Sequence, residues 1–130
     1  MSKKVISIVL CLALVLAMAI PAFAATTTLY SRTNAGYRIT GTATVSSSRA
    51  TSTMTASEVS GSAVKPIEEY SDSVVFITAY DKAGNKIGTA SNYGYPTLTT
   101  VLTGTTTSIY RAEFTHTFNN TTYGYYTLYA

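Results

Sequence analysis

The chain has 130 residues, a formal net charge of +3 and a single cysteine, Cys11. The 106 residues from Ala25 to Ala130 carry 24 Thr, 12 Ser and 11 Tyr, and their net charge is only +1. This composition excludes a disulfide-stapled scaffold, a coiled coil and a basic surface for nucleic acid.

The first 24 residues have the organisation of an export signal. Two lysines near the start precede an uncharged apolar run of 16 residues, shorter than the ~20 that a membrane-spanning helix needs. Small residues at Ala22 and Ala24 then form a peptidase site. We expect cleavage after Ala24 and a secreted, extracellular protein without membrane insertion. The signal is similar to those of exported proteins from Gram-positive bacteria.

The remaining chain is poor in aliphatic side chains. Val, Ile, Leu and Phe together number 18 of its 106 residues. Such a low fraction is typical of disorder, but disorder also requires a high net charge, which is absent here. The 11 tyrosines can supply the missing apolar area, because an aromatic side chain buries ~150–250 Å². We therefore predict one folded domain over residues 25–130.

Alternation of apolar and polar residues predicts the first strands. Residues 37–45 have Tyr, Ile, Gly, Ala and Val at odd positions and Arg or Thr at even ones, which indicates a half-buried strand. Gly41 marks a bulge or a close approach in it. A weaker strand follows over residues 50–59. Residues 61–72 form an edge strand, or a loop with one helical turn at 68–70, because Pro66 cannot donate a ladder hydrogen bond.

The next segment, residues 74–80, is apolar at nearly every position, as in a strand covered on both faces. It is expected to pair as a hairpin with residues 87–93 across a polar turn. A further strand is expected at 98–103. From 108 to 118 the alternation places His116 on one face with two phenylalanines.

The last strand, residues 123–129, has tyrosine on both faces. With Leu128 and Tyr126 directed into the core, three tyrosines would point outward: Tyr123, Tyr125 and Tyr129. The opposite assignment stays open, because both faces are aromatic.

Seven or eight short strands separated by turns predict an all-β fold, an antiparallel β-sandwich, with a small β-barrel as the alternative. Within it, Ala79-Tyr80-Asp81 enters a turn at Gly84-Asn85, and Ile87 leaves it. This hairpin resembles those of immunoglobulin-like modules on bacterial surface proteins. The resemblance implies an immunoglobulin-like sandwich, but it conveys no function.

The sequence predicts no catalytic residues, no cofactor and no zinc site. Nucleophilic catalysis needs a base beside the nucleophile, and His116 is the only histidine. It shares a face with Phe114 and Phe118, away from Glu113, so we interpret it as structural. The acidic side chains of Glu68, Glu69 and Asp72 could bind Ca²⁺, but a solvated acidic loop is favoured, because the spacing of a calcium loop is absent.

Tyrosine remains as the candidate residue type for binding, because it is an amphipathic contact residue. The alternative is that the tyrosines fill a core that is poor in aliphatic residues, with their hydroxyls at its rim. The candidate binding residues are Tyr93, Tyr95, Tyr123, Tyr125 and Tyr129. The favoured function is a non-enzymatic module that binds cell-wall polysaccharide, another glycan or a surface protein. The alternatives are a self-associating structural protein of a surface layer or biofilm, since few charges protect the strand edges, and a secreted antimicrobial or signalling polypeptide.

The export signal makes the first prediction. The secreted protein should begin at Ala25, because Ala22 and Ala24 satisfy the peptidase. Intact-mass measurement of the protein from culture medium checks this, and a mass that retains the first 24 residues would contradict it.

Overall fold

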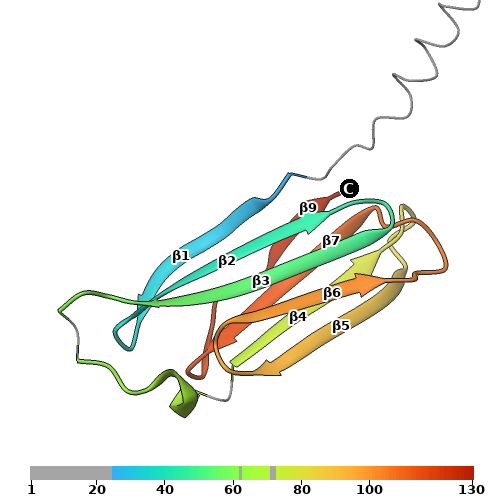
Figure 1. Ribbon diagram of the computed structural model, residues 1–130. Coiled ribbons are helices and arrows are strands. Elements are labelled where there is room, and N and C mark those ends of the chain that lie inside the picture. Colours follow the sequence, from blue (N-terminus) through green and yellow to red (C-terminus); the bar gives the residue numbers. More distant parts are fainter. Residues whose placement is uncertain (1–24, 62, 71–72) are drawn as a thin grey trace, which may run out of the picture.

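The computed structural model describes residues 25–61, 63–70 and 73–130, so the predicted export signal lies outside the described residues. In this part of the chain, no helix is long and apolar enough to span a membrane. The strands form two antiparallel sheets that pack face to face (Figure 1). No strand ladder between described residues joins the two sheets, as a closed barrel would require. The fold is therefore the predicted β-sandwich.

The first sheet has four strands in the order β1-β2-β3-β6. Their bounds are β1 Thr27–Asn34, β2 Tyr37–Val45, β3 Arg49–Glu58 and β6 Leu98–Thr103. The bounds of β2 and β6 agree with the sequence analysis. Strand β1 was not predicted from the sequence, because it lacks a regular alternation and contains a single buried residue, Tyr30.

The second sheet has the order β5-β4-β7-β8, and β9 also pairs with β7. Its strands are β4 Ser73–Tyr80, β5 Lys86–Gly94, β7 Arg111–Phe118, β8 Thr121–Thr122 and β9 Tyr126–Tyr129. Strands β4 and β5 form the predicted hairpin. In the connection from β3 to β4, the 3-10 helix η1 (Ile67–Tyr70) agrees with the loop that contains one helical turn, and not with the alternative of an edge strand.

The chain crosses between the sheets three times. It passes from β3 to β4, returns from β5 to β6 and crosses again from β6 to β7. Strand β3 pairs with β6 in one sheet, while β4 pairs with β7 in the other. These interlocked pairs make β4 and β7 the central strands of the second sheet, each with a hydrogen-bonded neighbour on both sides.

Tyrosine supplies much of the core, as the composition predicts. The core has an aromatic half and an aliphatic half. The aromatic half contains Tyr30, Tyr37, Ile39, Met54, Tyr70, Val75, Leu98, Phe118 and Tyr123. The aliphatic half contains Ala43, Val45, Ala50, Ile77, Ala79, Leu102, Ile109, Ala112 and Phe114. Buried hydroxyls need partners, and the Tyr37 hydroxyl, for example, donates to the Lys65 carbonyl oxygen at 2.6 Å.

Gly41 of β2 lies opposite a bulge in β1, and the side chain of Tyr30 approaches it closely. The register of β1 against β2 shifts between Thr28 and Tyr30, and Tyr30 pairs with Gly41. A Cβ atom at Gly41 would overlap Cε1 of Tyr30 and would lie 2.8 Å from Nδ1 of His116. The missing side chain therefore creates the space through which the Tyr30 ring reaches His116.

The second prediction follows from this contact. Gly41→Ala should destabilise the protein by about 3 kcal/mol, because overpacking a filled core displaces neighbouring side chains. Urea unfolding of the purified protein measures the loss. In a Tyr30→Leu background the same substitution should cost less, because the two closest contacts, with the Tyr30 ring, are gone and only the contact with His116 Nδ1 remains. Equal costs in both backgrounds would contradict the proposed origin of the clash.

Candidate functional site

The outer side of β4 presents apolar side chains to solvent. Alternate residues of this strand point away from the core, among them Val74, Phe76 and Tyr80. Phe76 is 37% exposed although it lies in the middle of a central strand. The expectation that residues 74–80 are covered on both faces is therefore wrong, because a two-layer sandwich covers only one face of each sheet.

Register places further aromatic residues on the same side. Tyr93 of β5 lies beside Val74, and Tyr129 of β9 lies beside Arg111, which in turn pairs with Tyr80. Tyr93 is 67% exposed and Tyr129 is 64% exposed. We call this surface the aromatic face and define it by Phe76, Tyr80, Tyr93 and Tyr129. Six residues of β4 separate its two ends, which is ~20 Å at ~3.3 Å per residue.

A charged cluster lies at one end of the aromatic face. The guanidinium carbon of Arg111 lies 3.9 Å from the centroid of the Tyr80 ring. Arg111 Nη1 donates to Glu113 Oε1 at 2.6 Å, and the Tyr80 hydroxyl donates to Glu113 Oε2 at 3.2 Å. Partial burial, and then this bond to the carboxylate, raise the pKa of Tyr80. The three side chains hold one another in place and combine an aromatic ring with hydrogen-bonding groups.

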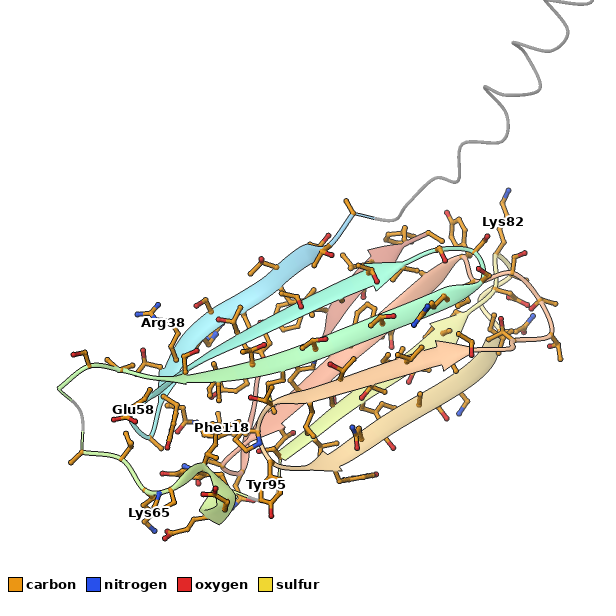
Figure 2. The ribbon with its side chains drawn as sticks, in the orientation of Figure 1. Arg38, Glu58, Lys65, Lys82, Tyr95 and Phe118 are labelled. Carbon is orange, nitrogen blue, oxygen red and sulfur yellow. The ribbon has the colours of Figure 1, made fainter. Side chains whose placement is uncertain are left out.

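Three further exposed tyrosines, among them Tyr110, lie outside the strands. Tyr125 is 81% exposed and lies between β8 and β9. Tyr95 lies in the loop between β5 and β6, at the end of the sandwich that also carries Lys65 and opposite the end with Lys82 (Figure 2). Of the predicted binding residues, the structure thus places Tyr93 and Tyr129 on one sheet face and leaves Tyr95 in a loop at one end.

The outward placement of Tyr123 is wrong. Its side chain is buried and stacks on Tyr30, with ring centroids 4.9 Å apart. Its hydroxyl accepts a hydrogen bond from Asn34 Nδ2 at 2.9 Å. The physical reason is Gly124, whose φ of 58° interrupts the strand, so that Tyr123 and Tyr125 do not share the alternation of a single strand. As predicted, Tyr126 and Leu128 pack against the core.

The outer face of the first sheet has a different chemistry. Its two central strands direct alternating, mostly half-buried threonines outward: Thr40, Thr42 and Thr44 on β2, and Thr51, Thr53 and Thr55 on β3. Among the large apolar side chains that are exposed in the described ranges, only Val101 lies on a strand of this sheet. Exposed aromatic rings on strands are therefore confined to the second sheet.

His116 is fully buried, in the face that it shares with Phe114 and Phe118. Its Nδ1 atom bonds to the Tyr30 hydroxyl, and its Nε2 atom bonds to Ser52 Oγ, both at 2.6 Å. Burial lowers the pKa of His116 from 6.5 to about 4. A Ser–His contact is typical of a nucleophile and its base, but Ser52 is also fully buried, so a substrate cannot reach its oxygen in this conformation.

The partners of His116 could not be identified from the sequence. Ser52 lies at an inward position of β3, between the buried Ala50 and Met54. A hydroxyl at a core position of an alternating strand is a signal that a buried polar partner exists. The identity of that partner depends on how β3 packs against β7, which the alternation of a single strand does not contain.

The acidic residues that could bind Ca²⁺ do not form a metal site among the described residues. Glu68 and Glu69 lie in η1, and Glu69 forms an exposed ion pair with Lys65 at 3.7 Å. Asp72, the third residue of the Ca²⁺ candidate, lies outside the described residues. Among the residues that the structure describes, no group of three or more acidic, histidine or cysteine side chains could hold a metal ion.

Comparison with known proteins gives no matching family model, no matching curated sequence and no matching solved structure.

Proposed function

We propose that this protein is a small extracellular, non-enzymatic binding module, and that the aromatic face binds a polysaccharide chain. One observation carries the proposal. A central strand directs Val74, Phe76 and Tyr80 away from the core, where burial would otherwise stabilise the fold. Contiguous apolar residues on the exterior of a small soluble domain are typical of an interaction site.

The chemistry of the face suits a sugar ring. Aromatic rings have a partly negative face, which attracts the partly positive C–H groups on one side of a pyranose. Polar groups are interleaved with the rings: Ser91 and Thr115 flank Phe76 in the register, and Arg111 and Glu113 lie beside Tyr80. A sugar needs both kinds of contact, because hydroxyl groups surround its apolar surface.

The dimensions also suit an extended ligand. From the Tyr93 end to the Tyr129 end the face spans ~20 Å along β4, and the step from β5 to β9 crosses three strand spacings, ~14 Å. A linear chain of several sugars would therefore contact rings at both ends. Export to the cell exterior, predicted from residues 1–24, would bring the module to cell-wall and host glycans.

The third prediction concerns this face. In protein expressed from Ala25, Phe76→Thr and Tyr93→Thr should each weaken binding to peptidoglycan sacculi or insoluble β-glucans by about tenfold, because each removes a ring that stacks on the ligand. Threonine suits a strand, so the fold should persist. Sedimentation binding assays measure the affinity, and circular dichroism checks the fold.

Val101→Thr is the matched control, because it removes an exposed apolar side chain from the opposite sheet. It should leave binding unchanged. Unaltered binding by folded Phe76→Thr and Tyr93→Thr variants would rule out the aromatic face as the binding site for polysaccharide. If the wild type instead forms dimers that Phe76→Thr abolishes, then the face binds a second copy and the polysaccharide proposal is wrong.

A further inference from the structure

A chain of buried hydrogen bonds connects three strands across the sandwich. The Tyr30 hydroxyl on β1 bonds to Nδ1 of His116 on β7, and Ser52 Oγ on β3 bonds to Nε2. Ser52 Oγ also donates to the carbonyl oxygen of Thr42 at 3.2 Å. The chain therefore joins both sheets through one imidazole ring.

We assign the direction of each bond from the number of protons, because the roles of the two ring nitrogens depend on the tautomer. Ser52 has one hydroxyl proton, which it gives to the Thr42 carbonyl, so at its other contact it accepts from His116. Nε2 of His116 then carries the ring proton, and Nδ1 accepts the proton of the Tyr30 hydroxyl. Every proton of this network has an acceptor only while His116 is neutral.

Among the described residues, no negatively charged side chain bonds to the imidazole ring to balance an added proton. The titratable side chains that pack around it are tyrosines: Tyr30 itself, with Tyr123 and Tyr126 stacked on Tyr30. Burial raises the pKa of Tyr30 and of Tyr123, so both stay neutral in acid. The nearby Arg32 carries a positive charge, which acts to lower the pKa of Tyr123 and cannot balance a protonated imidazole. From β2, β3 and β4 the neighbouring groups are Gly41, Ser52 and Val75, none of which is charged.

The three strands are not held equally. Strands β3 and β7 have hydrogen-bonded neighbours on both sides, whereas β1 is an edge strand that pairs only with β2. Tyr30 is the only buried residue of β1, and most of the others are exposed. The Tyr30 side chain is thus the one fully inserted attachment of β1 to the core, beside the partly buried Leu29, and it passes through the space left by Gly41.

We propose that the Tyr30–His116 hydrogen bond is an acid-sensitive latch, and that protonation of His116 releases β1 from the sandwich. The added proton occupies Nδ1, which can no longer accept from the Tyr30 hydroxyl. A buried imidazolium without a counter-charge destabilises the folded state. Water can reach the ring most easily by displacing Tyr30, which lies on the edge strand. Tyr30 therefore leaves first, and β1 separates from β2.

The stability of the protein should change with pH in a definite direction. His116 titrates at about 4 in the folded state and at 6.5 in the unfolded state. Between these values the unfolded chain binds a proton that the folded chain does not. The contribution of His116 to stability is therefore complete above pH 6.5, falls as the pH decreases toward 4, and is constant below that. Within this window, each decrease of one pH unit should raise the ratio of unfolded to folded protein by up to ~10-fold.

Hydrogen exchange followed by mass spectrometry tests the latch. We expect the amides of β1 to lose at least tenfold in protection between pH 7 and pH 4.5, after correction for intrinsic rates, while those of β4 and β7 lose much less. Constant protection of β1 across this range in the wild-type protein overturns the proposal, whether or not any variant folds.

Two variants identify His116 as the group that titrates. His116→Gln can still accept from Tyr30 and donate to Ser52 but cannot become charged, so β1 should stay protected at pH 4.5. The same acid loss in folded His116→Gln would assign the effect to another group. Tyr37→Phe is the matched control, because it removes a buried tyrosine hydroxyl that bonds to Lys65 and not to His116. It should keep the acid-dependent release of β1.

Discussion

The contact of Tyr30 with His116 is the interaction that attaches the edge strand β1 to the opposite sheet. It crosses the core, and it requires a glycine at position 41, a serine at position 52 and a neutral imidazole at the same time. Its origin lies in the composition. A chain with few aliphatic residues fills its core with tyrosine, and every buried hydroxyl then needs a hydrogen-bond partner. The core gains specificity from these bonds, because a shift of any of the three strands would leave polar atoms unpaired.

The two-layer architecture leaves each sheet with an outer face, and these two faces differ in composition. Each sheet can bury only one side, so the residues on the other side are free of packing constraints. On the first sheet these positions carry threonine, which suits an exposed strand. On the second sheet they include Phe76, Tyr80, Tyr93 and Tyr129. Strand propensity does not distinguish these choices, since aromatic residues and threonine are both favoured in strands. The proposed binding of a polysaccharide would account for rings on only one face.

The hydrophobic alternation was a good guide wherever one face of a strand is buried and the other is wet. The strand at residues 37–45, and the face that His116 shares with Phe114 and Phe118, were predicted for this reason. The same reasoning failed at Tyr123, because Gly124 divides the last segment into two pieces that do not share one alternation. It also failed for β1, an edge strand whose exposed residues have no apolar partner to alternate with.

The sequence by itself determined the β class of the fold, most of the strand bounds and the need for tyrosine in the core, because these follow from local periodicity and composition. Tertiary structure alone decided which tyrosines are buried, that Phe76 faces solvent, and that His116 bonds to both Tyr30 and Ser52. The bonded side chains are 86 and 64 residues apart along the chain. Contacts at such separations depend on how the sheets stack, and the pattern of a single strand carries no information about the strand that covers it.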